Sequence, residues 1–107
     1  MVNKEINLID YSTFNKKYKN ILITGGLGFI GSALILRLLN ETNIKIFNID
    51  KSIQKNSSLS INYQFASYGE SRYHFLNHDL KNKENFKNIF NECDPDLVFH
   101  LAAESHV

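Results

Sequence analysis

The stretch Asn20-Ile-Leu-Ile-Thr-Gly-Gly-Leu-Gly-Phe-Ile-Gly31 decides the fold of this 107-residue chain. It opens with the apolar run Ile21, Leu22 and Ile23, which ends at a threonine and two glycines. A short apolar run that is stopped by glycine is typical of a strand buried on both faces. We therefore expect the first strand over residues 20–24.

A helix is expected next, over residues 29–40, where apolar residues are dense and Ala, Leu and Arg favour helix. We expect most of this helix to be buried. β-branched and aromatic residues predict a strand over 44–50, and an alternating pattern predicts another over 72–77. Between them, Ser, Asn, Gln and Lys dominate residues 51–71, which indicates a long loop with room for one short helix.

An amphipathic helix is expected over residues 82–92. Its apolar stripe recurs at i, i+3, i+4 and i+7 and consists of Phe86, Ile89, Phe90 and Cys93. Asn82 is the candidate N-cap, Asp94-Pro95-Asp96 ends the helix, and residues 97–102 form a fourth apolar strand. Because Cys93 lies on the stripe, we expect it to be a buried apolar residue.

Glycines at positions 25, 28 and 31 lie at the junction of the first strand and the first helix. Gly25 can take the positive φ that a sharp turn needs, and Gly28 lets a diphosphate approach the backbone where no Cβ intervenes. Gly31 lets the helix pack closely on the sheet. The N–H groups of about Phe29 and Ile30 then point outward at the positive end of the helix dipole, which predicts a site for the diphosphate of a dinucleotide.

Asp50 ends the second strand, 19 residues after Gly31, where this fold places an acid beside the adenosine ribose. Its carboxylate would accept hydrogen bonds from the ribose hydroxyls and repel a 2′-phosphate. This favours NAD over NADP, although the neighbouring Lys51 weakens the preference. Asp79 and Leu80 follow the third strand at the same edge and are expected to flank the adenine ring.

The segment Leu101-Ala102-Ala103-Glu104-Ser105-His106 follows the fourth strand, also at the carboxyl edge. Its small residues would let the nicotinamide half of the cofactor lie against the backbone. Ser105 and His106 are placed to reach a substrate.

Strands that alternate with helices imply parallel strands, right-handed crossovers and helices on both faces of the sheet. Together with the glycine turn, this order predicts the α/β class: a Rossmann-type doubly wound parallel sheet, incomplete, with about four strands present. We divide the chain into a polar N-terminal extension over residues 1–19 and an NAD-binding Rossmann portion over residues 20–107.

The 12 basic and 11 acidic residues give a net charge of +1, which excludes the strong positive field that drives binding to nucleic acids or anionic membranes. The single cysteine, and the lack of an apolar stretch in residues 1–20 that could serve as an export signal or span, predict a cytoplasmic protein. His74, His78 and His100 form no metal-ligand spacing with Cys93, so we expect no metal site.

The glycine motif resembles that of the extended short-chain dehydrogenase/reductase family of nucleotide-sugar enzymes. His100-Leu-Ala-Ala-Glu-Ser-His-Val107 is similar to the segment after strand four in the dTDP-glucose 4,6-dehydratases of that family, and Phe47-Asn-Ile-Asp-Lys51 is similar too. The resemblance implies NAD as cofactor, dTDP-glucose as substrate, a 4-keto-6-deoxy sugar as product, and homodimers. It places cofactor contacts at Gly25, Gly28, Phe29, Ile30, Gly31, Asp50, Lys51, Asp79, Leu80, Leu101, Ala102, Ala103, Glu104 and Ser105, with Ser105 also next to the sugar.

The chain departs from the family pattern in two places. Ser52-Ile53 stands where the family has Leu-Thr, at the adenosine end of the site. No tyrosine here is followed by a lysine four residues later, and the family's Thr-Asp-Glu trio is missing. We therefore expect the chain to hold the cofactor half of a dehydratase without its catalytic half, to contain no catalytic residue, and to be inactive by itself.

Two other interpretations stay open. In the first, the chain is part of another nucleotide-sugar enzyme, such as an epimerase, since such enzymes share the glycine motif. Alternatively, it is a stand-alone sensor module that binds NAD without turning it over. The Ala102–Val107 segment favours the dehydratase over the epimerase.

Overall fold

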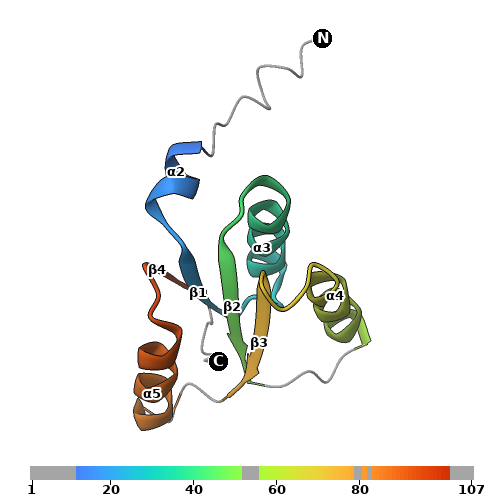
Figure 1. Cartoon of the computed structure of the whole chain (residues 1–107). Coiled ribbons are helices and arrows are strands. Elements are labelled where there is room, and N and C mark those ends of the chain that lie inside the picture. The colour runs from blue at the N-terminus through green and yellow to red at the C-terminus, as the bar shows by residue number, and fades with distance from the viewer. Residues whose placement is uncertain (1–11, 52–55, 79–80, 82, 102–107) are drawn as a thin grey trace.

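The computed structural model describes residues 12–51, 56–78, 81 and 83–101. Four strands and four helices are found in these residues (Figure 1). In chain order they are α2 (Ser12–Lys17), β1 (Asn20–Thr24), α3 (Phe29–Glu41), β2 (Lys45–Asp50), α4 (Asn56–Ala66), β3 (Tyr73–Asn77), α5 (Lys83–Cys93) and β4 (Leu97–His100).

The strands form one parallel sheet in the order β3-β2-β1-β4. Ile21 pairs with Ile46 on one side of β1 and with Leu97 on the other. The chain thus moves from β1 outward to β3 and then crosses back to place β4 beside β1. All four carboxyl ends meet at one edge, and the order reverses between β1 and β4. The predicted doubly wound parallel sheet is therefore confirmed for these residues.

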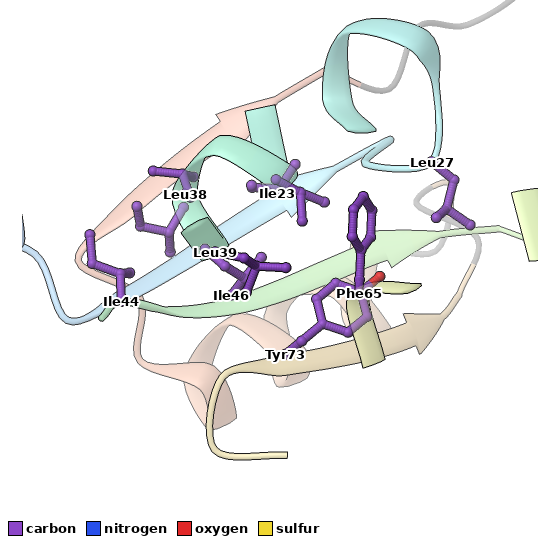
Figure 2. Packing of buried hydrophobic residues seen from close by; sticks show 10 residues of the cluster. Ile23, Leu27, Leu38, Leu39, Ile44, Ile46, Phe65 and Tyr73 are labelled. Atoms are coloured by element: carbon purple, nitrogen blue, oxygen red, sulfur yellow. The ribbon is translucent and has the colours of Figure 1, made fainter. Parts of the chain in front are cut away.

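Helices cover both faces of the sheet, with α3 and α4 on one side and α5 on the other (Figure 1). The larger core lies under α3 and α4 and includes Ile23, Ile46 and Tyr73 from the strands, several of whose side chains are drawn in Figure 2. Within it the rings of Phe65 and Tyr73 pack at a tilt, with their centroids 5.4 Å apart. The smaller core under α5 contains Leu22, Ile49, Ile89 and Cys93. The buried position predicted for Cys93 is confirmed.

The α4 helix corrects the expectation of a mostly irregular segment over residues 51–71. Its Ser- and Asn-rich composition hides an apolar face at helical spacing, formed by Ile61 and Phe65, which pack on the larger core together with Tyr68 just beyond the helix. Tertiary burial of that face outweighs the weak helix propensity of the polar residues. Gly69, with φ of 96°, ends the segment in a left-handed turn that other residues rarely adopt.

A short helix, α2, precedes β1, where the sequence pattern predicts only a polar extension. Phe14 and Tyr18 pack against each other and against the larger core. The Asn15 side-chain oxygen also accepts a hydrogen bond of 2.8 Å from the Asn43 amide at the start of β2. These contacts tie residues 12–18 to the end of the sheet opposite the glycine turn.

The first turn of α3 differs from the expectation of a mostly buried helix. The helix buries Gly31, Ile35, Leu38 and Leu39, but Phe29 is 93% exposed and Ile30 is 71% exposed. At this end the helix rests on the loop that precedes it rather than on the sheet. The exposed pair therefore belongs to the surface around the predicted cofactor site.

None of the helices in the described residues has the length and hydropathy that crossing a bilayer would demand.

The structure otherwise shifts element boundaries by one or two residues. Strand β2 begins at Lys45, not at residue 44. Strand β4 ends at His100, so Leu101 follows the strand, and residue 102 of the predicted strand 97–102 lies outside the described residues.

Arg72 closes the carboxyl end of α3. Its Nε donates to the Ile44 carbonyl at 3.1 Å, and one Nη donates to the Thr42 carbonyl at 2.7 Å and to those of Leu38 and Leu39 at 3.4 and 3.2 Å. The last carbonyls of a helix lack intrahelical donors and carry partial negative charge. A guanidinium supplies both the hydrogen-bond donors and the positive charge. Burial lowers the pKa of Arg72, because leaving water disfavours the charged form.

We predict that Arg72→Ala lowers the free energy of unfolding by about 2 kcal/mol, because several carbonyls lose a charged donor. Urea denaturation followed by circular dichroism measures the loss. Arg37→Ala on the exposed side of α3 is the matched control and is expected to change stability by less than about 0.5 kcal/mol. Equal losses in the two variants would show that the bonds of Arg72 add nothing to stability.

Candidate functional site at the carboxyl edge of the sheet

The glycine turn leaves the carboxyl end of β1 and enters α3 within four residues. Gly25 has φ of 75° and donates its amide hydrogen to the Ile49 carbonyl at 2.9 Å, which extends the β1–β2 ladder by one step. The Gly28 amide then donates back to the Gly25 carbonyl at 3.2 Å. The positive φ expected at Gly25 is confirmed, and it reverses the chain so that α3 starts directly above the sheet edge.

Gly31 packs on the turn itself. A Cβ at this position would lie 2.4 Å from the Gly25 carbonyl oxygen and 2.8 Å from the Gly26 Cα, both of them backbone atoms. The helix packs closely at Gly31 as expected, but its partner is the preceding loop and not the sheet. At Gly28, in contrast, a Cβ would meet only the Gly25 oxygen, at 3.4 Å, and the residue is exposed. Its backbone is therefore open to a ligand from outside.

The first turn of α3 presents three consecutive amides, those of Phe29, Ile30 and Gly31, for which the described part of the chain supplies no acceptor. The N-cap residue is Gly28, which has no side chain with which to cap them. Unpaired amides at a helix N-terminus, combined with the positive end of the helix dipole, favour an anion. The geometry thus fits a phosphate group, while the binding of a dinucleotide here stays a prediction.

Asp50 lies beside the same turn, at the carboxyl end of β2, and is half-buried. Its Oδ2 accepts a hydrogen bond of 3.3 Å from the Leu27 amide, and its Oδ1 accepts one of 2.9 Å from the Lys51 amide. The carboxylate is therefore aimed at the glycine turn, as the sequence predicts. Each oxygen keeps a second lone pair, so both can accept from a ligand hydroxyl. Lys51 is exposed and next to it.

The other site residues predicted from the sequence are distributed unevenly in the structure. Leu101 lies beside the end of β1, where its amide donates to the Thr24 carbonyl at 3.0 Å, while its side chain packs on the larger core. Residues Asp79, Leu80, Ala102, Ala103, Glu104, Ser105 and His106 lie outside the described residues.

Two features of this edge were not foreseen from the sequence. Thr24 Oγ1 and His100 Nδ1 form a 2.7 Å hydrogen bond across the β1–β4 pair, although His100 was expected to be a plain strand residue. The second feature is Asn48, which is fully buried in β2 and accepts a 2.9 Å hydrogen bond from the Gly26 amide. In the sequence, a polar residue inside the apolar strand Ile46–Ile49 indicates a buried hydrogen-bonded contact, because a buried amide needs partners.

A parallel sheet in this order, with a glycine turn and unpaired helix amides at its switch point, defines a Rossmann-type nucleotide-binding fold. The chain belongs to the GDP-mannose 4,6 dehydratase family, whose sequence profile matches residues 22–107. It is 45% identical over 88 residues to a dTDP-glucose 4,6-dehydratase of Haemophilus influenzae, covering 82% of this chain and 25% of that enzyme. The corresponding enzyme of Salmonella typhimurium is 42% identical, with 81% of this chain and 23% of the enzyme covered.

The chain thus spans about a quarter of the length of the curated relatives it matches. Solved structures agree on the fold. A UDP-glucose-4-epimerase from Stenotrophomonas maltophila with bound NAD superposes with a TM-score of 0.66 at 26% identity, covering 83% of this chain and 26% of that one. A UDP-glucuronic acid 4-epimerase from Bacillus cereus in complex with NAD gives a TM-score of 0.61 at 30% identity, covering 82% and 28%.

The contrast between Gly31 and Gly28 generates a prediction. Gly31→Ala is expected to lower the free energy of unfolding by about 2–3 kcal/mol, because its Cβ meets backbone that cannot yield without moving the turn. Gly28→Ala is expected to change it by less than about 1 kcal/mol, because Gly28 has an ordinary φ of −75° and room for a Cβ. Urea unfolding of both variants tests this, and equal stability would contradict the packing described for Gly31.

Proposed function

We propose that this chain binds NAD at the glycine turn and forms the cofactor-binding portion of a nucleotide-sugar 4,6-dehydratase that converts dTDP-glucose to dTDP-4-keto-6-deoxyglucose. The observation that carries the proposal is the row of three amides at the start of α3 that find no acceptor within the described residues, with the Asp50 carboxylate beside it. The similarity to dehydratases that act on dTDP-glucose supports the substrate class. The NAD named in the epimerase structures supports the cofactor.

In this proposal the amides of Phe29, Ile30 and Gly31 donate to the diphosphate oxygens, and Gly28 lets those oxygens reach the backbone. The Asp50 carboxylate accepts hydrogen bonds from the ribose hydroxyls at the adenosine end. Bound NAD would supply a hydride acceptor for the sugar. The contribution of these residues is to hold the cofactor in one orientation, and the described residues contain no group that we assign to proton transfer.

The remaining site residues, the cytoplasmic location and the homodimer belong to the same proposal. Lys51, Asp79 and Leu80 would complete the adenosine end, and residues 101–105 would line the nicotinamide end, with Ser105 beside the sugar. A single cysteine, Cys93, and a near-neutral charge support a reducing compartment and a small-molecule substrate over nucleic acid.

An epimerase is the second candidate, because epimerase structures share the fold at 26–30% identity. Sequence identity of 45% and 42% to two dehydratases favours the dehydratase. The alternative to an enzyme is a sensor module that binds NAD without turnover. It predicts the same cofactor contacts.

The Asp50 carboxylate generates a prediction about cofactor choice. Its charge repels a 2′-phosphate, and a charged hydrogen bond contributes about 1.5–3 kcal/mol, so NAD should bind about tenfold or more tightly than NADP. Asp50→Asn keeps an acceptor for the Leu27 amide but removes the charge, and should narrow the difference to about threefold or less. Isothermal titration measures both affinities.

Glu41→Gln is the matched control for Asp50→Asn, because it removes one negative charge at the opposite end of α3. It should leave the preference for NAD unchanged. Equal affinities of the unaltered chain for NAD and NADP would contradict the role given to Asp50.

These 107 residues contain no Tyr-x-x-x-Lys pair to deprotonate a sugar hydroxyl, so they should bind NAD without converting dTDP-glucose. Mass spectrometry of an incubation with NAD and dTDP-glucose should show unchanged substrate. A 4-keto-6-deoxy product would mean that other residues of this chain carry the chemistry.

A further inference from the structure

Asn48 is a polar residue with no exposed surface, placed at the centre of β2 on the side that faces α3 and α4. Both ends of its amide are used. The oxygen Oδ1 accepts from the Gly26 backbone amide at 2.9 Å, and the nitrogen Nδ2 donates to the Tyr73 hydroxyl at 2.9 Å. Because a backbone amide can only donate, the oxygen must face Gly26, and the orientation of the side chain is settled.

Tyr73 connects Asn48 to α4. Its hydroxyl donates to the Asn62 side-chain oxygen at 2.6 Å. Burial raises the pKa of Tyr73 to about 12, so the hydroxyl keeps its proton and remains a donor at neutral pH. The ring of Tyr73 is held against Phe65 of α4, also within the larger core (Figure 2). Asn48, Tyr73 and Asn62 therefore form one directed relay from the glycine turn through β2 and β3 to α4.

A steric observation points to the same contact. A Cβ on Gly26 would lie 2.2 Å from Asn48 Oδ1 and 2.4 Å from the Ile35 Cδ1. The isoleucine methyl could rotate away, but the Asn48 oxygen is held by its own hydrogen bonds. Gly26 has no positive φ that would require glycine, so its lack of a side chain is explained by the approach of Asn48.

Two side chains of strand β2 thus hold the glycine turn at successive residues, next to the backbone bond from the Gly25 amide to the Ile49 carbonyl. The Gly26 amide is bound by Asn48, and the Leu27 amide is bound by Asp50, two positions further along the same strand. These anchors lie immediately before the unpaired amides of α3. A small movement of the turn would change where those amides point, because only Leu27 and Gly28 separate Gly26 from Phe29.

We propose that Asn48 is a positioning residue for the diphosphate site: its amide, held in turn by Tyr73 and Asn62, sets the glycine turn so that the first amides of α3 are preorganised for the cofactor. This inference rests on the proposed binding of NAD. It assigns to Asn48 no contact with the cofactor, and it predicts that the relay matters for the diphosphate and not for the adenosine.

The test uses the 107-residue chain with three ligands: NAD, ADP and adenosine. Asn48→Leu replaces the amide by an apolar side chain of similar size and removes both hydrogen bonds. We expect the Kd values for NAD and ADP to rise by about tenfold or more, while that for adenosine changes by less than about twofold. A residue that only stabilises the core would affect all three ligands alike or none.

Thr42→Val is the matched control. Thr42 is also buried, and its hydroxyl donates to the Leu38 carbonyl at 2.6 Å and accepts from the Ile44 amide at 3.2 Å, but it lies at the far end of α3. This variant also loses a buried polar group, and its Kd for NAD and ADP should stay within about twofold of the unaltered chain. All Kd values are measured at a temperature where circular dichroism shows each variant to be folded.

Tyr73→Phe tests the positioning role of Asn48 if the Asn48→Leu variant does not fold. It removes one hydroxyl, leaves Asn48 in place, and should raise the Kd for NAD and ADP by about threefold without affecting adenosine. In the same variant, the Gly26 amide hydrogen should exchange with solvent faster relative to that of Ile23 inside β1.

The outcomes separate the two claims. If the unaltered chain binds neither NAD nor ADP, the proposed function is wrong. If it binds them but the relay variants bind equally well, or lose adenosine to the same extent, NAD binding stands and the positioning role of Asn48 is overturned.

Discussion

Backbone packed on backbone at the glycine turn is the constraint on which this structure depends. The helix α3 approaches the end of β1 so closely that a methyl group at Gly31 would touch the Gly25 carbonyl at 2.4 Å. Such an approach is open only to glycine, and it sets both the start of the helix and its position over the larger core. The crossover from β1 to β2 runs through this helix.

The same constraint creates the electrostatics of the candidate site. A helix that begins at a glycine, with no capping side chain, leaves the amides of Phe29, Ile30 and Gly31 without an acceptor among the described residues at its positive end. The parallel arrangement brings the carboxyl end of β2 to the same edge, so that Asp50 faces the turn. A group that favours anions and a group that accepts from hydroxyls thus lie side by side. That pairing matches the diphosphate and the adjoining ribose of an adenosine diphosphate, and it supports the NAD site that we propose.

Much of the fold and part of the site could be predicted from the residues alone. Continuous apolar runs and glycine spacing place β1, the glycine turn and α3, and the position of Asp50 after the second strand follows from the same pattern. For residues 51–71 the pattern predicts a loop with room for one short helix and does not reveal the extent of α4, because its polar composition conceals the apolar face of Ile61 and Phe65, which becomes stabilising only against the sheet. The pattern also predicts a largely buried α3, whereas Phe29 and Ile30 are exposed, because hydrophobicity does not reveal that the first turn rests on a loop.

The amino-acid sequence by itself determined the order of the four strands with α3 and α5, the positive-φ turn at Gly25 and the presence of an acid at the end of β2, because these depend on local periodicity and on the freedom of glycine. Tertiary structure alone decided which partners the buried polar groups find. Asn48 and Tyr73 lie 25 residues apart and meet only because β2 and β3 pair in one register. A buried amide gains its hydrogen bonds from the geometry of its neighbours, and that geometry exists only once the sheet has formed.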